Sequence, residues 1–258
     1  MATRSTAEKA KAQPQGKVRR SQMLTTYGPG ALVDLLDFAV IINGLDAWRF
    51  GHAGFEKLPE PRLRDRIAAR LKGSDVRLSV DAAFRLPPAG DDADPSPFVG
   101  VTARLFPRWF VCQNPRCRTL TTYKQLEFKG NRFKHDCGHA CVPVRFVQAC
   151  ASGHIDDLNW VGFVHQGEPC AAPELRLDEG RTGDFAEVKV ECVACERARA
   201  LRDLKVDDMR PPCRGKRPWL GPESDEACTL KAALIMRTAS NAYFSQLDSA
   251  LTIPDTSN

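Results

Sequence analysis

The chain has 258 residues, ten cysteines and a formal net charge of +5. Six of its 37 basic residues and one of its 32 acidic residues lie in residues 1–20, so the rest of the chain is neutral. The neutral body argues against a protein that binds nucleic acid through overall positive charge. No apolar run suits a signal peptide or a membrane span, and the sequence therefore predicts a cytoplasmic protein with no membrane partner.

The N-terminal residues 1–20 predict a disordered basic tail, followed by ordered structure from about Ser21. Residues 21–30 predict a short extended segment and a tight turn, because glycines flank Pro29. Such a turn can present backbone N–H groups to a phosphate or a partner, although a plain structural turn is the alternative. The candidate DNA or partner contacts here are Arg19, Arg20, Tyr27, Gly28 and Gly30.

Two elements and a loop are expected before residue 100. Residues 38–42 predict a buried strand, and residues 59–71 predict a helix with an apolar stripe of Leu63, Ile67 and Leu71. Residues 87–97 form an acidic, proline-rich loop. We therefore expect an N-terminal α+β region at 21–100 and a double zinc-binding region at 101–258.

Eight cysteines fall into two sets whose spacing is typical of tetrahedral zinc sites. In the first set, two short-gap pairs are separated by nineteen residues. In the second, a short pair is joined by two isolated cysteines, which are assigned to it by elimination. The two sets are Cys112, Cys117, Cys137 and Cys141, and Cys192, Cys195, Cys213 and Cys228. Reduced thiols are expected in the cytoplasm, so both sets predict structural Zn²⁺ rather than disulfides.

The remaining two cysteines lie close to histidines in the sequence. Cys150 and His154, together with His165 and Cys170, could form a third, mixed metal site. The alternative is that these are two ordinary buried cysteines and two polar histidines. We expect two structural zinc ions, with the third site as an open alternative.

Strands are expected on both sides of the first cysteine set. Residues 109–112, 142–147 and 187–192 predict strands, whereas residues 229–237 predict a short helix. Asp156 and Asp157 are expected in the first turn of another short helix. The predicted fold class is α+β, irregular and zinc-stabilised, with zinc-ribbon-like β modules and short helices, because so small a core needs metal.

One spacing resembles that of a metal-dependent nuclease. Glu187 and Lys189, preceded by Asp178 or Asp184, fit the acid-x-Lys pattern in which acids hold Mg²⁺ and lysine stabilises charge. Such loose patterns arise often by chance, and the segment leads into a cysteine pair. Cysteine quartets also leave no open coordination position for catalysis. We therefore expect a protein that is not an enzyme.

Several blocks of sequence together resemble the DrmB family, a component of the bacterial DISARM anti-phage defence system. The blocks are residues 19–31, 106–117, 143–157, 218–221 and 239–244. The resemblance implies an accessory subunit that associates with DrmA, a superfamily 2-type helicase, to bind DNA beside a DNA methyltransferase. It implies no catalytic residues. Family members are usually longer, so these blocks correspond to their N-terminal portion.

The leading hypothesis is thus a non-catalytic, zinc-binding accessory subunit of a DISARM-type complex, which assists a DrmA-like helicase in DNA binding or translocation. One alternative is a stand-alone zinc-ribbon DNA-binding protein, which salt-dependent DNA binding by the chain alone would favour. The other alternative is the Mg²⁺-dependent nuclease.

Overall fold

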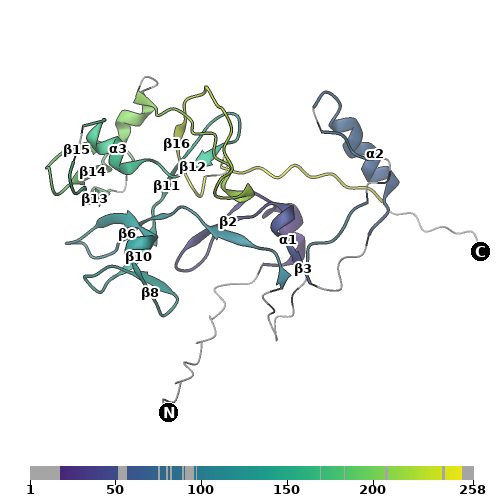
Figure 1. Cartoon of the computed structure of the whole chain (residues 1–258), viewed down its shortest axis with the longest axis horizontal. Helices are drawn as coiled ribbons and strands as arrows, with labels where there is room; N and C mark the ends of the chain where they lie inside the picture. The colour runs from purple at the N-terminus through teal and green to yellow at the C-terminus, as the bar shows by residue number, and fades with distance from the viewer. Residues whose placement is uncertain are drawn as a thin grey trace, which may run out of the picture.

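The computed structural model describes residues 18–251, apart from residues 52–56, 75, 80, 82, 89, 91–95, 97, 169, 183, 207–208 and 240–241. Residues 1–17 of the expected basic tail and most of the acidic loop at 87–97 therefore lie outside the described residues. Within them the fold is α+β, as expected, with short antiparallel strands and few helices (Figure 1). The helices are α1 (Arg20–Thr25), α2 (Pro61–Arg70) and α3 (Trp160–His165).

The largest sheet among the described residues has eight antiparallel strands, in the order β15-β14-β13-β7-β6-β10-β9-β8. One half is the meander β13–β14–β15. In the other half, the hairpin β6–β7 joins the meander β8–β9–β10 because β6 pairs with β10, and β7 pairs with β13 to connect the halves. The strands are β6 (Trp109–Cys112), β7 (Thr119–Thr122), β8 (Glu127–Lys129), β9 (Arg132–Lys134), β10 (Ala140–Pro143), β13 (Leu175–Asp178), β14 (Lys189–Cys192) and β15 (Ala198–Ala200).

Smaller sheets flank the eight-stranded one. Three strands pair in the order β1-β2-β5, three more in the order β12-β11-β16, and β3 pairs with β4. Their bounds are β1 (Leu32–Asp34), β2 (Ala39–Ile42), β3 (Arg49–Phe50), β4 (Val99–Gly100), β5 (Ala103–Leu105), β11 (Phe146–Ala149), β12 (Ile155–Asp156) and β16 (Ala233–Met236). Short 3₁₀ turns lie between the strands of the chain: η1 (Leu45–Ala47), η2 (Tyr123–Gln125), η3 (Leu201–Lys205) and η5 (Pro218–Leu220).

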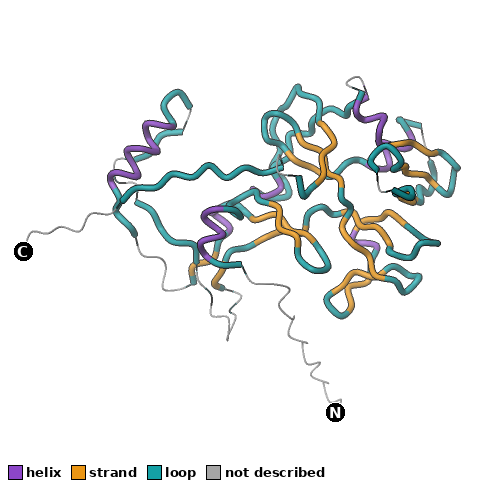
Figure 2. Tube along the Cα trace, turned by 180° about the vertical axis from the view of Figure 1, so that it is seen from behind, coloured by secondary structure: helices purple, strands orange, loops and turns teal. Residues whose placement is uncertain are grey.

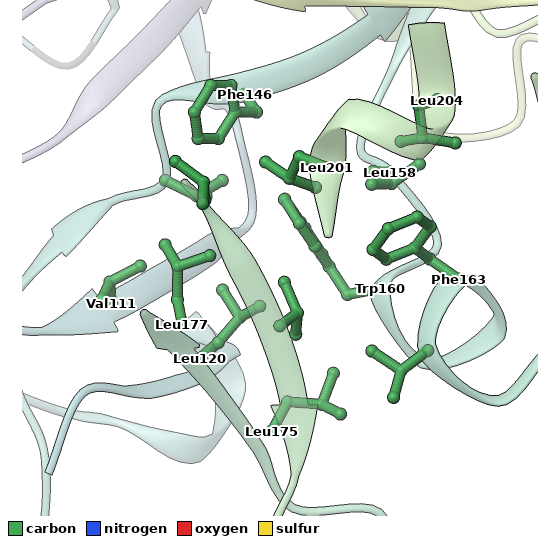
Figure 3. Packing of buried hydrophobic residues seen from close by; sticks show 14 of the residues in the cluster. Val111, Leu120, Phe146, Leu158, Trp160, Phe163, Leu175, Leu177, Leu201 and Leu204 are labelled. Atoms are coloured by element: carbon green, nitrogen blue, oxygen red, sulfur yellow. The ribbon is translucent and has the colours of Figure 1, made fainter. Parts of the chain in front are cut away.

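The main hydrophobic core lies between the β13–β14 side of the large sheet, α3 and η3. Trp160 and Phe163 of α3 face Leu201 and Leu204 of η3, and the ring of Trp160 is fully buried (Figure 3). Leu175 and Leu177, two residues apart on β13, point from the same face of the strand into this core (Figure 3). A large tryptophan at this position contributes more buried apolar area than any aliphatic neighbour.

The N-terminal elements are partly as predicted. The strand at 38–42 and the helix at 59–71 are confirmed as β2 and α2. The extended segment predicted from Ser21 is wrong, because Arg20–Thr25 is helical. The Gln22 side chain, at the third helical position, accepts a hydrogen bond of 2.8 Å from the Arg19 backbone N–H and so caps the first turn.

Further along the chain, the strands at 109–112 and 187–192 are confirmed as β6 and β14, although β14 begins at Lys189. The single strand expected at 142–147 is instead two strands, β10 and β11, in different sheets. The helix predicted at 229–237 is wrong. Four of its residues form β16, because pairing with β11 outweighs the local helix preference of alanine and leucine.

The C-terminal segment runs away from the sheets toward α2, which stands apart from them (Figures 1 and 2). Asp248 pairs there with Arg66 at 2.8 Å and Arg70 at 2.5 Å, both on α2. Both arginines are exposed, so these ion pairs contribute little stability. Because α2 also buries no residue, it is a peripheral element.

Candidate metal centres

Three groups of cysteine and histidine side chains come together among the described residues. In each group three cysteines and one histidine place their ligand atoms within 4.8 Å of one another. The first cluster is Cys112, Cys117, His135 and Cys137; the second is Cys150, His154, Cys213 and Cys228; the third is His165, Cys170, Cys192 and Cys195. All ten cysteines are free thiols. Each group could hold one metal ion.

Turns at both arms shape the first cluster. Asn114 Oδ1 accepts a hydrogen bond of 3.0 Å from the Arg116 backbone N–H, so the chain folds back between the first two cysteines. In the other arm, Gly138 adopts a φ of 81°, which a residue with a Cβ rarely does. Sγ of Cys112 then lies 3.4 Å from Sγ of Cys137.

Two side chains compete for the fourth position of the first cluster. His135 Nδ1 lies 3.4 Å from Cys117 Sγ. Cys141, a member of the predicted set, is buried on β10 directly opposite Cys112 and outside the group of four. Burial raises the thiol pKa of Cys112 to about 12 and that of Cys141 to about 11, whereas the contact with His135 lowers that of Cys137 to about 5. A bound cation would favour the thiolate form of every sulfur ligand.

The second cluster joins the hairpin of β11 and β12 to a distant loop. Nδ1 of His154 lies 3.2 Å from Cys150 Sγ and 3.4 Å from Cys213 Sγ, and the sulfurs of Cys150 and Cys228 are 4.0 Å apart. Burial raises the pKa of Cys150, but hydrogen bonds with the backbone of His154 and Ser152 outweigh it and lower this pKa to about 7. Burial raises the pKa of Cys213 to about 11, so Cys150 ionises more readily than Cys213.

A carboxylate orients the histidine of the second cluster. Nε2 of His154 contacts Glu226, which also pairs with Arg217 at 2.7 Å. Arg217 and His154 together lower the Glu226 pKa to about 2. The carboxylate thus stays ionised and holds the proton on Nε2, which leaves Nδ1 as the ligand atom, an arrangement typical of metal-binding histidines.

The third cluster uses the opposite nitrogen of its histidine. Nδ1 of His165, in the last turn of α3, lies 2.8 Å from the Val161 carbonyl oxygen, to which a protonated Nδ1 donates a hydrogen bond. Nε2 then faces Cys195 Sγ at 3.4 Å. Cys192 ends β14, and its sulfur lies 3.9 Å from that of Cys170. Backbone and side-chain hydrogen bonds outweigh burial at Cys192 and lower its thiol pKa to about 6.

The four-ligand composition determines what these clusters can do. Three thiolates and one imidazole complete the tetrahedral coordination of Zn²⁺, and they leave no position for a substrate or an activated water. The arrangement is that of metal sites which fix the fold. Each cluster also joins segments far apart in the chain, such as Cys150 and Cys228.

The structure groups the ligands differently from the sets that their spacing predicted. The set of Cys192, Cys195, Cys213 and Cys228 is divided, because the first pair joins the third cluster and the second pair joins the second cluster. The mixed third set is divided too: Cys150 and His154 belong to one cluster, and His165 and Cys170 to another.

Two functional side chains were absent from the sequence prediction. The first is His135, whose position two residues before Cys137 was the available signal. The second is Glu226, which lies in the loop between Cys213 and Cys228 and had no signal in the sequence.

The remaining candidate residues have structural partners. Asp156 and Asp157 precede α3 rather than occupying its first turn, which contains no acid. They are buried and pair with Arg214 at 2.6 Å and Arg108 at 2.7 Å, respectively. Their predicted role against the helix dipole is therefore wrong, because Asn159 caps α3 instead.

The acid-x-Lys pattern also has local partners. Glu187 accepts hydrogen bonds of 3.0 and 3.2 Å from the backbone N–H groups of Arg181 and Thr182, so it closes a turn. Lys189 lies 3.4 Å from Asp178 on the neighbouring strand. Among the described residues, the groups of side chains close enough to share a metal consist only of cysteine and histidine.

The glycine turn near the N-terminus faces the interior of the protein. The Gly30 backbone N–H donates a hydrogen bond of 2.8 Å to the Ile42 carbonyl, and the Trp219 ring packs against Gly30. The Tyr243 hydroxyl covers Gly28, and Tyr27 packs into a small core. These glycines are thus half-buried parts of a structural turn, while Arg19 and Arg20 are exposed beside it.

Two comparisons with known proteins identify relatives of this chain. The family model described as a domain of unknown function, DUF8724, matches residues 19–244, which include all three clusters. The chain belongs to this family. It is also 32% identical over 159 residues to the DISARM protein DrmB of Bacillus paralicheniformis, a stretch that covers 58% of this chain and 28% of that relative. The resemblance to the DrmB family is thereby confirmed, and the chain aligns with less than a third of this relative's length.

Among the described residues, no helix is both long enough and apolar enough to cross a lipid bilayer.

Proposed function

We propose that the chain is a non-catalytic, zinc-stabilised accessory subunit of a DISARM-type anti-phage complex. It would assist a DrmA-like superfamily 2 helicase in binding DNA or moving along it, in the cytoplasm. The similarity to the DISARM protein DrmB carries this proposal. Since the chain covers 28% of that relative, its own contribution would be that of one portion of the subunit.

The metal clusters support a scaffolding role. Each would bind Zn²⁺ in a closed set of four protein ligands, and such sites stabilise folds rather than activate substrates. The loops that they fix would form a rigid surface for the helicase or for DNA. Rigid surfaces lose less conformational entropy on association than flexible ones.

The proposal is tested by co-expressing the chain with a DrmA-like helicase and separating the product by size exclusion. We expect co-elution, about three zinc ions per chain as three closed sets require, and a higher DNA-stimulated ATPase rate than that of the helicase alone. Separate elution of a folded, zinc-loaded chain, with no change in ATPase rate, would contradict the proposal.

The two alternatives give different results in the same preparation. A stand-alone DNA-binding protein would bind DNA without the helicase, with affinity that falls steeply with salt. A nuclease would cleave DNA in Mg²⁺, and the Glu187→Ala, Lys189→Ala double variant would stop the cleavage. We expect no cleavage by either form, because Glu187 accepts hydrogen bonds from its own turn.

A further inference from the structure

A hollow of about 450 Å³ lies beside the second cluster, between three segments distant in the sequence. One wall is β5 with the residues that follow it, the second is the η2 turn, and the third is the loop at residues 216–224. This volume is within the range of pockets that bind small organic ligands. The proposed scaffolding role does not use this hollow.

Four cations and one carboxylate, that of Asp156, line the hollow, and two of the cations lack a counter-ion. Asp156 is neutralised by Arg214 at 2.6 Å and also lies 3.5 Å from Arg108. Arg108 pairs with Asp157 at 2.7 Å, and Lys216 pairs with Asp225 at 3.0 Å. Arg104 and Lys124 are exposed, and among the described residues neither side chain has a hydrogen bond or an ion pair. Two positive charges therefore face this space without compensation, in a chain whose body is neutral overall.

Arg108 is held in place for binding. Its backbone N–H and its Nε both donate hydrogen bonds to the Asp157 carboxylate, at 2.9 and 2.7 Å. Asp157 is buried, yet 56% of the Arg108 side chain remains accessible. The guanidinium thus keeps donors for a ligand in a fixed orientation, and such preorganisation lowers the entropic cost of binding.

The remaining lining is suited to a flat or apolar group. Leu105, Pro218 and Pro222 contribute apolar surface, and Tyr123 contributes an aromatic ring. A ligand that matches both the cations and this apolar lining carries an anionic group with several oxygens, attached to a ring. From the charge, the fixed guanidinium and the apolar wall, we propose that the hollow binds the phosphate ester of a nucleotide, either free or within a single nucleic-acid strand.

The second metal cluster controls the shape of this site. Cys213 and Cys228 bound the loop that supplies Lys216, Pro218 and Pro222. The Lys216 carbonyl also accepts a hydrogen bond of 3.1 Å from the Ile155 backbone N–H, next to His154. Metal bound at the second cluster would hold this wall in position, so phosphate binding would depend on that metal.

The test uses the full chain without the helicase, so it can fail independently of the proposed function. A fluorescent oligothymidylate strand is titrated, with thymidine monophosphate and inorganic phosphate as competitors. The Arg104→Ala, Lys124→Ala variant should bind the strand at least about tenfold more weakly, because it loses two charge-assisted contacts. Its slope of log affinity against log salt should fall by about 1.4.

An Arg116→Ala, Arg202→Ala variant is the matched control, because it removes the same charge from exposed positions outside the hollow. Its affinity should stay close to that of the native chain, and both variants should keep the native zinc content. Single Arg104→Gln and Lys124→Gln variants, which keep most of each side chain, should show intermediate losses.

The competitors separate the two sources of phosphate. Displacement of the strand by the monophosphate would identify a nucleotide site, and binding of the strand alone would identify contacts along a backbone. Equal affinity of the native and Arg104→Ala, Lys124→Ala forms, or an equal loss in the control, would overturn the proposal. Cys228→Ser should weaken binding about as much as the pocket variant, whereas Cys170→Ser in the third cluster should leave it unchanged.

Discussion

The structure divides the predicted set of Cys192, Cys195, Cys213 and Cys228 between two clusters, and combined substitutions test this division. Cys195→Ser and Cys213→Ser belong to different clusters in the structure, although the sequence spacing had placed them in one. Each single variant should lose about one zinc ion of about three, because a site with three remaining ligands binds metal much more weakly. The double variant should lose about two.

The expected loss of stability follows from the loops that the metals close. In the second cluster His154 and Cys213 are 59 residues apart, and in the third Cys195 and His165 are 30 apart. Chain-entropy estimates for cross-links of these lengths are about 4 kcal/mol each, and metal clips act in the same sense. The double variant should therefore lose about 8 kcal/mol, a large share of the stability of a typical domain.

Zinc content is measured by mass spectrometry under native conditions on the folded fraction, and stability by urea unfolding. The Cys213→Ser, Cys228→Ser variant is the control, because both substitutions fall in one cluster. It should lose about one zinc ion. Its free energy of unfolding should lie no more than about 1 kcal/mol below that of either single variant. If the Cys195→Ser, Cys213→Ser variant lost only one zinc ion, the grouping in the structure would be refuted.

The remaining predictions concern single side chains around the clusters. His135→Ala should remove the metal of the first cluster and Cys141→Ser should retain it, as zinc content will show; the reverse result would restore the sequence-based set. Glu226→Gln should weaken metal binding at the second cluster about 10- to 100-fold in chelator competition, without affecting the others. Arg108→Met should destabilise the fold by about 2 kcal/mol in urea, since the buried Asp157 carboxylate loses its guanidinium partner and keeps the backbone N–H of residue 108. A second change, Asp157→Asn, should recover most of this loss.

The sequence predicted the chemistry of the metal centres better than their membership. Cysteine spacing identifies pairs on one turn, as in Cys192 and Cys195, because neighbours in sequence must be neighbours in space. It carries no information on which distant pair completes a site. In the structure the third cluster lies, in sequence, inside the loop closed by the second, and this nesting depends on sheet pairing that spacing does not encode.

Secondary structure shows the same limit. The strand β6 and the helix α2 have strong local patterns and were predicted. The segment that forms β16 contains good helix formers, and only its pairing with β11 decides its conformation. Likewise α1 forms because Gln22 caps it, a contact that competes with the extended tendency of the threonines that follow. At β16 a tertiary contact outweighed local preference, whereas at α1 one local contact outweighed another.

The positions of the clusters give a reason why a fold built from such short strands would bind three metal ions. Strands of two to four residues, such as β12 and β11, bury little area each. A metal at the end of a hairpin fixes several loop residues at once, which spares the protein a larger core. It also leaves the fixed loops accessible on the surface. In this arrangement the loop between Cys213 and Cys228 would be held firmly as one wall of the hollow, while Arg104 and Lys124 on the other walls stay exposed, which is what a subunit that contacts phosphate groups requires.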